Sequence, residues 1–258
     1  MDNEKRTALV TGASAGLGVE FGKQLAFRGY DVVLVARREE RLKAVAANIK
    51  ERHGVHAYPF AADLASPDAP PAIFQKVQDL GVNIDYLVNN AGSAGPDLLQ
   101  QRDWTKQEEF LELMMISVAR MCHLFAPGMQ ARRFGRIINV ASVAGRIPRK
   151  GDLNYGPSKA YLIALSEALD LTLRPYGVRV CALCPGFTHT EFHAVAGMLE
   201  RKAQLPGFIW YDADVVVREA LSAIEKGKSV FVSGRLYRWL DPFLQSVWTR
   251  HLITFLNR

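Results

Sequence analysis

The sequence predicts an α/β fold in which about seven parallel strands form one doubly wound sheet flanked by helices. Its apolar runs are rich in Val, Leu and Ile and are continuous, which is typical of strands buried on both faces. Amphipathic stretches of helical length separate these runs, as crossover connections between parallel strands require. The 258 residues contain no low-complexity tract, linker or internal repeat, which favours a single domain.

Strands and helices alternate from the start of the chain. The expected strands are TALVTG at 7–12, DVVLVAR at 31–37, VHAYPFAAD at 55–63, IDYLVNNAG at 84–92, GRIINVAS at 135–142, VRVCALCPG at 178–186 and SVFVSG at 229–234. The expected helices cover 16–28, 38–54, 104–131, 155–176 and 214–226. Gly29 and Gly177 follow two of these helices, and glycine is a common helix stop.

Composition and charge exclude several classes of protein. The formal charge of +6 comes from basic residues spread along the chain, without the cluster or motif that a nucleic-acid partner requires. Three cysteines make no disulfide framework, and Cys181 and Cys184 point to opposite faces of an expected strand, which indicates packing in a reducing compartment. With no signal region and no apolar run of membrane length, we expect a cytoplasmic protein.

A glycine-rich turn, TGASAGLG at 11–18, joins the first expected strand to the first helix. Glycines at such a turn let backbone N–H groups approach a pyrophosphate at the positive end of a helix. An ordinary strand–helix turn is the alternative. The position of the turn in the first β-α unit favours a dinucleotide site.

The end of the second expected strand carries arginine instead of a carboxylate. NAD-binding folds often place an acid there for the ribose hydroxyls, but Arg37 and Arg38 precede the first carboxylate, Glu39. A guanidinium suits a 2′-phosphate because it makes paired charged hydrogen bonds. We therefore expect NADP(H) as the preferred cofactor, held by Arg37, with NAD(H) as the alternative; two solvated arginines would look the same.

A phenol and an ammonium stand four residues apart in NYGPSKAY at 154–161. On a helix, residues i and i+4 share one face, so Tyr155 and Lys159 point into the same space. The pair either lies on a solvated surface or prepares the phenol to exchange a proton. Spacing alone favours the surface, whereas Ser142 upstream and the glycine turn favour the proton exchange.

Six motifs occur in a fixed order along the chain: TGASAGLG, Asp63-Leu64, NNAG at 89–92, Ser142, Y-x-x-x-K at 155–159 and PGFT at 185–188. In this combination the chain resembles the short-chain dehydrogenase/reductase family over roughly residues 6–235. The resemblance implies a Rossmann-type domain and an NAD(P)-dependent oxidoreductase acting on CH–OH donors. It also implies a homodimer or homotetramer that pairs through long helices.

The resemblance assigns a role to each matching residue. The pyrophosphate turn would be lined by Gly12, Ser14, Ala15, Gly16, Leu17 and Gly18. The adenine would be edged by Asp63 and Leu64, the cofactor ribose supported by Asn90, Ala91 and Gly92, and the nicotinamide end held by Pro185, Gly186 and Thr188. The chemistry would be carried by Ser142, Tyr155 and Lys159, of which the last two also meet the cofactor.

Those three residue types suffice for carbonyl reduction. The cofactor supplies a hydride, and the protein supplies orientation and a proton. A free phenol has a pKa of about 10, and we expect the Lys159 ammonium, with oxidised nicotinamide, to lower the pKa of Tyr155. Tyr155 would then act as acid and base, while Ser142 donates a hydrogen bond to the substrate oxygen.

One position departs from the family pattern. The family usually places an asparagine in its fourth long helix, where it holds a water that links the lysine to solvent. In LMMISVA at 113–119, Ser117 takes that position, and a hydroxyl has one donor where an amide has two. We expect Ser117 to join the catalytic group with a weakened or rerouted proton relay.

The segment 187–212 would cap the substrate. Six of its apolar residues form either a pocket wall or ordinary packing: Phe187, Phe192, Met198, Leu199, Phe208 and Trp210. His189 and His193 stand four apart without a third ligand, so no metal site is predicted. Residues 1–236 would then form the domain with this cap, and 237–258 an amphipathic extension.

The extension, YRWLDPFLQSVWTRHLITFLNR, interleaves aromatic residues and arginines at near-helical spacing. It would pack on the protein, pair with another subunit or lie on a membrane surface, and we favour packing, with peripheral membrane association second. The leading function is an NADP-dependent reductase of ketones or aldehydes with an apolar small-molecule substrate. The alternatives are a non-catalytic NADP(H)-binding regulatory protein and a membrane-surface lipid reductase.

Overall fold

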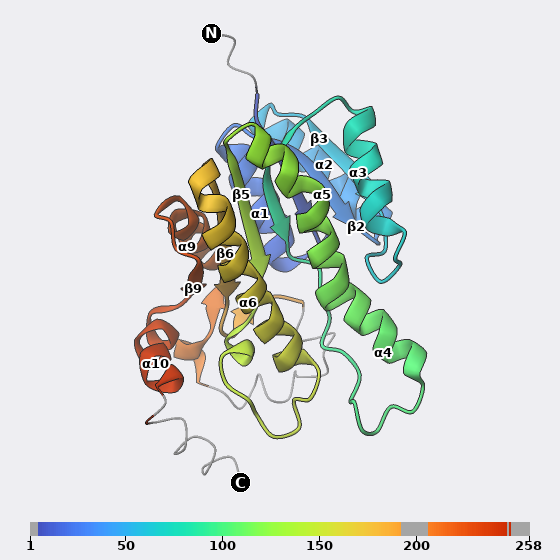
Figure 1. Cartoon of the computed structure of the whole chain (residues 1–258). Coiled ribbons are helices and arrows are strands. Elements are labelled where there is room, and N and C mark those ends of the chain that lie inside the picture. The colour runs from blue at the N-terminus through green and yellow to red at the C-terminus, as the bar shows by residue number, and fades with distance from the viewer. Residues whose placement is uncertain (1–4, 192–205, 247, 249–258) are drawn as a thin grey trace.

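The computed structural model, which describes residues 5–191, 206–246 and 248, contains a sheet of seven parallel strands (Figure 1). In spatial order they are β3 (Ala57–Ala61), β2 (Asp31–Ala36), β1 (Thr7–Thr11), β4 (Ile84–Asn89), β5 (Gly135–Val140), β6 (Val178–Cys184) and β9 (Val230–Val232). A two-residue pair, β7 (Thr188–His189) and β8 (Tyr211–Asp212), forms a separate small sheet. The predicted doubly wound α/β fold of the Rossmann type is therefore confirmed.

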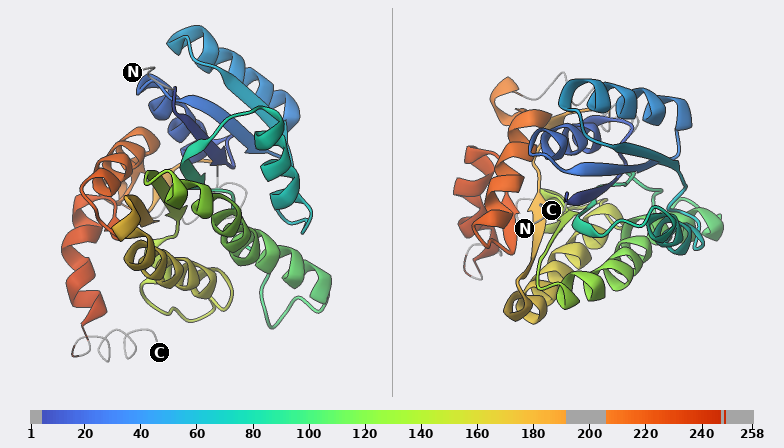
Figure 2. Two further views of the ribbon diagram at one scale, coloured as in Figure 1. Left: turned by 45° about the horizontal axis from the view of Figure 1, so that its top comes forward. Right: turned by 90° about the horizontal axis from the view of Figure 1, so that it is seen from above.

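Helices cover both faces of the sheet (Figure 2). On one face lie α1 (Gly16–Phe27), α2 (Glu39–His53) and α9 (Ala213–Glu225), whose apolar sides include the fully buried Phe21, Leu42 and Val216. On the other face lie α3 (Ala69–Asp79), α5 (Ser117–Ala131) and α6 (Tyr155–Leu173), with Ile73, Val118 and Leu162 buried. Continuous apolar strands were expected to have a core on each face, and they do.

The cysteines fit this two-sided core. Cys184 belongs to the cluster beneath α5 and α6, and Cys181 to the cluster beneath α1 and α9. Both are free and buried, as is Cys122 on α5. The prediction that Cys181 and Cys184 point to opposite faces of their strand is confirmed.

Two helical features differ from the predicted elements. The helix α3 was not predicted, although Pro70 and Pro71 stand in its first turn, where a missing N–H costs nothing. The predicted helix 104–131 is α4 (Trp104–Leu111), a π-helical turn (Glu112–Ile116) and α5. The spacing of apolar residues does not reveal this π-helical turn, because one extra residue in a single turn barely shifts the apolar face of the helix.

The helical region Trp104–Ala131 is the only one in the described residues that is long and apolar enough to cross a membrane. Its side chains Val118, Met121 and Phe125 are nearly fully buried against the sheet. That packing is the packing of a core helix.

The last described helix is α10 (Arg235–Gln245), beyond β9 at the lower left of Figure 1. One side is tied to the protein, since Arg146 donates to Asp241 at 2.8 and 2.6 Å and the Tyr237 hydroxyl donates to Ile209 O at 3.0 Å. Trp239, Phe243 and Trp248 remain exposed. Packing on protein, which was favoured for this stretch, accounts for one side of α10; most of 246–258 lies outside the described residues.

Candidate functional site

The residues that the sequence pointed to gather where the strands end, around the point at which strand order reverses between β1 and β4. Ligands of such sheets bind at this reversal. The glycine turn after β1 depends on close backbone approach: a Cβ on Gly18 would lie 2.2 Å from Gly12 O. Only glycine fits at position 18, so the start of α1 can lie directly on the turn.

The turn is locked to the segment that follows β4. The Thr11 hydroxyl accepts hydrogen bonds from Asn90 N at 2.9 Å and Ala91 N at 3.1 Å. The Asn90 side-chain amide donates back to Thr11 O at 2.9 Å. The predicted pyrophosphate and ribose segments are therefore one rigid unit.

Behind this unit lies a buried polar chain that sequence reasoning did not find. The Asn89 amide donates to Asn139 Oδ1 at 2.8 Å, and the Asn139 amide donates to Ser166 Oγ at 2.9 Å. All three residues are buried, and the chain joins β4, β5 and α6. Satisfied buried polar groups specify a unique arrangement, so the chain sets how α6 sits on the sheet.

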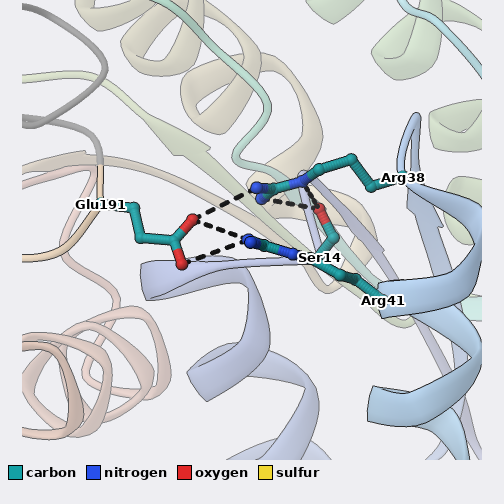
Figure 3. Close-up of polar contacts among 4 residues, drawn as sticks. All are labelled: Ser14, Arg38, Arg41 and Glu191. Atoms are coloured by element: carbon teal, nitrogen blue, oxygen red, sulfur yellow. Dashed lines mark hydrogen bonds and ion pairs between the residues drawn. The ribbon is translucent and has the colours of Figure 1, made fainter.

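The arginines after β2 point in different directions. Arg37 is exposed, and its guanidinium lies 3.7 Å from Asp63 Oδ2. Arg38 instead turns toward the glycine turn and donates to Ser14 Oγ at 3.2 and 3.1 Å (Figure 3). Arg38 therefore reaches the predicted cofactor turn, whereas the sequence predicts Arg37 as the arginine that holds the 2′-phosphate.

A carboxylate completes this cluster. Glu191 Oε2 accepts from Arg38 Nη1 at 3.2 Å and from Arg41 Nη1 at 3.0 Å, as Figure 3 shows. The hydrogen bond from Arg38, and next in size the one from Arg41, lower the pKa of Glu191. Sequence reasoning missed Arg41 and Glu191; the three-residue spacing of Arg38 and Arg41 at the start of α2 was the available signal for the former.

The candidate catalytic residues converge on the ends of β5 and β6. Ser142 caps the 3-10 turn Val143–Gly145 by accepting from Ala144 N at 3.1 Å. A Cβ on Gly145 would lie 2.6 Å from the backbone of Lys159, so this turn rests directly on α6. A side-chain hydrogen bond joins Ser142 to Tyr155.

Tyr155 is the first residue of α6, and its neighbours fix it there. Asp152 Oδ1 accepts from Gly156 N at 2.8 Å. The Asn154 amide donates to Gln107 Oε1 at 2.6 Å and to Pro96 O at 3.0 Å. The helix start is thereby tied to the loop after β4 and to α4.

Burial governs the ionisation of both central groups. It raises the pKa of Tyr155 to about 12, opposed by a hydrogen bond from Ser142. It lowers the pKa of Lys159 to about 8. In the protein without cofactor the Lys159 nitrogen is 5.7 Å from the ring centre, and burial of the phenol dominates. The lowering expected from Lys159 together with oxidised nicotinamide stays a prediction for the cofactor-bound protein.

Lys159 is nearly buried and donates to Val140 O at 2.7 Å. Met114, in the π-helical turn, and Lys159 both lie against Gly92: a Cβ on Gly92 would lie 3.2 Å from Met114 Sδ and 3.8 Å from Lys159 Nζ. Ser117 donates its hydroxyl to Leu113 O at 2.8 Å, one turn back in its own helix. That bond occupies the one hydroxyl donor of Ser117 in this structure, and a part for Ser117 in a proton relay stays a prediction.

The remaining predicted cofactor residues line the same edge of the sheet. Val143 N donates to Pro185 O at 3.0 Å, which places the segment Pro185–Thr188 beside Ser142. Thr188 Oγ1 donates to Gly186 O at 3.1 Å. Leu64 has its side chain in the core, so only its backbone and the half-exposed Asp63 face outward.

A hollow of about 200 Å³ opens beside Tyr155, lined by residues 94–98 and 151–155. A larger hollow of about 740 Å³ lies at the opposite end of the strands, where β1 and β2 begin, and is lined by Arg6, Asp31 and Arg132 among others. The smaller hollow is the candidate substrate site, because it is lined by Tyr155 and the larger one is not. No three His, Cys, Asp or Glu side chains in the described stretches of the chain gather to hold a metal.

The predicted pocket wall is described only in part. The rings of Phe187 and Trp210 lie 5.0 Å apart, and His189 stacks on Trp210 at 5.3 Å. Phe208 is 71% exposed. Phe192, His193, Met198 and Leu199 lie outside the described residues.

The family described as short chain dehydrogenase matches residues 6–198, well over half of the chain. The chain belongs to the short-chain dehydrogenase/reductase family. It is therefore an oxidoreductase of that family, as the order of motifs predicted. The residues matched include the glycine turn, Ser142, Tyr155 and Lys159.

Relatives in this family cover nearly the whole chain. The 3-oxoacyl-(acyl-carrier-protein) reductase FabG of Staphylococcus aureus is 31% identical over 242 residues, 90% of this chain and 98% of the relative. A short-chain dehydrogenase from Sphingobium yanoikuyae, solved in complex with NADPH, is 32% identical with a TM-score of 0.82, covering 96% and 95% of the two chains. A bulky-bulky ketone specific alcohol dehydrogenase from Comamonas testosteroni is 27% identical with a TM-score of 0.77, covering 96% and 94%.

The buried amine makes a testable prediction about stability. Lys159 has a pKa of about 8 in the fold against an ordinary 10.5, so below pH 8 it is protonated in both states and folding bears its full desolvation cost. Between pH 8 and 10.5 only the unfolded chain keeps the proton, so stability rises with pH. We expect Lys159→Met to stabilise the fold by about 3 kcal/mol at pH 7 and by about 1 kcal/mol at pH 9.5. Urea unfolding at both pH values measures this, and an equal gain at both would contradict it.

Proposed function

We propose that this enzyme interconverts a ketone or aldehyde and the corresponding alcohol with NADP(H), using Tyr155 as the acid and base. The observation that carries the proposal is the meeting of Ser142, Tyr155 and Lys159 at the strand ends, beside the turn at Gly12–Gly18. This arrangement puts a proton donor, a hydrogen-bond donor and a cation in one small volume.

The residues present fit a phosphorylated dinucleotide. The close-packed glycine turn leaves backbone N–H groups free of side chains, and Arg38 and Arg41 already hold a carboxylate next to Ser14. An anion of the size of a 2′-phosphate suits these guanidiniums. The relative from Sphingobium yanoikuyae binds NADPH, which supports the same cofactor here. When bound, NADP(H) gives or takes the hydride.

Tyr155 supplies the proton in the reducing direction. With a pKa of about 12, the phenol keeps its proton at neutral pH and can deliver it to the substrate oxygen as negative charge grows there. With substrate bound, the Ser142 hydroxyl would turn from Tyr155 and donate its hydrogen bond to the same oxygen. The charge of Lys159, held by Val140 O, favours the phenolate left behind.

The substrate proposed is a ketone with apolar substituents. Phe187 and Trp210 place two aromatic rings beside the predicted nicotinamide segment. Relatives named as a 3-oxoacyl-(acyl-carrier-protein) reductase and a bulky-bulky ketone specific alcohol dehydrogenase support a carbonyl of this kind. We further propose that 187–212 caps the substrate within a domain of residues 1–236, and that the enzyme is a homodimer or homotetramer.

A second candidate, a reductase at a membrane surface, is favoured by α10. Trp239 and Phe243 lie one turn apart with ring centres 5.8 Å from each other, and both are more than half exposed. Exposed aromatic side chains beside arginines suit the interface of an anionic bilayer. A cytoplasmic enzyme with this helix resting on a membrane would draw apolar substrates from the lipid.

Replacing the proposed acid tests the mechanism. We expect Tyr155→Phe to lower kcat by about 10²- to 10⁴-fold, because the proton donor is lost, while NADPH affinity stays within about twofold. Tyr161→Phe, six residues along the same helix and partly exposed, is the control. Steady-state turnover of a ketone panel and NADPH fluorescence titration measure the two effects. Retained turnover in Tyr155→Phe would sink the mechanism, and absence of turnover by the wild-type enzyme would favour the non-catalytic alternative.

The two arginines after β2 give a comparative prediction. We expect Arg38→Leu to weaken NADPH binding by about tenfold or more and NADH binding by less than about twofold, since only NADPH has the 2′-phosphate. Arg37→Leu, at an exposed site paired loosely with Asp63, should weaken NADPH by less than Arg38→Leu. Dissociation constants for both nucleotides decide it; a larger loss in Arg37→Leu would restore the sequence-based assignment.

The aromatic side of α10 can be tested directly. We expect Trp239→Ser with Phe243→Ser to reduce binding to anionic vesicles by about tenfold or more, because two exposed rings are removed from the interface. Phe27→Ser with Leu171→Ser removes equally exposed apolar groups elsewhere and serves as control. Vesicle flotation measures the difference. Equal binding by both double variants would leave the membrane candidate without support.

A further inference from the structure

We propose that Glu191 is a cofactor-specificity residue whose carboxylate occupies the 2′-phosphate position and competes with NADP(H) for Arg38 and Arg41. The inference rests on the proposed function, which takes NADP(H) as the cofactor. It concerns a residue that lies beyond β7 in sequence, 150 positions after Arg41. Figure 3 shows its carboxylate facing both guanidiniums, with the Ser14 hydroxyl beside that of Arg38.

The contacts describe an anion site that is already filled. Arg41 Nη1 donates to both Glu191 oxygens, at 3.2 and 3.0 Å, and Arg38 Nη1 donates to one of them at 3.2 Å. Arg38 also donates to Ser14 Oγ in the glycine turn. The two guanidiniums after β2 and the Ser14 hydroxyl in the glycine turn are the donors that a ribose phosphate would use.

Charge makes the two occupants exclude each other. Two arginines carry +2, which a phosphate monoester of about −2 balances. Adding Glu191 at the same place would leave the cluster with an excess negative charge. A carboxylate of −1 holds the guanidiniums more weakly than the phosphate, and all three side chains of the cluster are about half exposed, so the ion pairs are weak enough to be displaced.

A second contact places the same segment against the cofactor turn. A Cβ on Gly16 would lie 3.1 Å from Thr190 Cβ and Cγ2, so Thr190 rests on the turn next to Glu191. Thr190 and Glu191 are therefore held over the glycine turn by the two arginines. A ligand with a 2′-phosphate must displace the Glu191 carboxylate from the arginines, whereas a ligand without this phosphate need not.

The test uses nucleotide fragments that do not depend on catalysis. Adenosine 2′,5′-bisphosphate and AMP are titrated calorimetrically into the full-length protein, its Glu191→Gln variant and a control, Glu225→Gln. Glu225 pairs with Arg136 at 3.0 Å near the start of β5, and the side chain of Glu225 is about as exposed as that of Glu191. It therefore reports the general effect of removing one negative charge.

We expect Glu191→Gln to tighten adenosine 2′,5′-bisphosphate binding by about three- to tenfold and AMP binding by less than about twofold. Glu225→Gln should change neither. Unchanged or weakened bisphosphate binding in Glu191→Gln, or equal tightening of AMP, overturns the inference. Ketone turnover with NADPH is measured in parallel. If the enzyme turns over but Glu191→Gln binds adenosine 2′,5′-bisphosphate with unchanged affinity, only the role of Glu191 is rejected. If the wild-type protein binds no adenosine 2′,5′-bisphosphate, that role is rejected together with the proposed cofactor.

Discussion

The hydrogen bonds between Thr11 and the Asn90-Ala91 backbone are the constraint on which the site depends. Strand order reverses between β1 and β4, so their chains leave the sheet in opposite directions, and these bonds hold the two exits together. The glycine turn can then approach a pyrophosphate, because these bonds set its position from the side of β4. The polar chain of Asn89, Asn139 and Ser166 extends this rigidity to α6, where Tyr155 and Lys159 stand.

The electrostatics divide the site into two ends with different physics. At the catalytic end, burial dominates: it keeps the Tyr155 phenol protonated and the Lys159 amine weakly basic, so each is sensitive to any charge brought beside it. At the end near Arg38 and Arg41 the groups lie in solvent, where ion pairs are weak and exchangeable. A dinucleotide would bridge the two, exchanging contacts at one end and altering ionisation at the other.

Much of the fold and the order of site residues followed from the sequence. Continuous apolar strands, the glycine turn and the Tyr155–Lys159 spacing have physical meaning without a structure, because periodicity and close approach are local. The features that could not be predicted are non-local. They are the direction of Arg38 as against Arg37, the approach of Glu191 and the position of Met114 against Gly92, which depend on where loops and a π-helical turn lie. Likewise the raised pKa of Tyr155 in the protein without cofactor could not be predicted, since burial cannot be read from a four-residue spacing.

The three buried cysteines can report on local opening of the fold. Burial raises the pKa of Cys122, Cys181 and Cys184 each to about 12, so at neutral pH only about one thiol in 10⁵ is a reactive thiolate in the closed fold. Cys181 and Cys184 face opposite layers of helices. Alkylation of each sulfur by iodoacetamide would therefore follow the separate opening of one layer, which lets the local stability of the two sides of the enzyme be compared residue by residue.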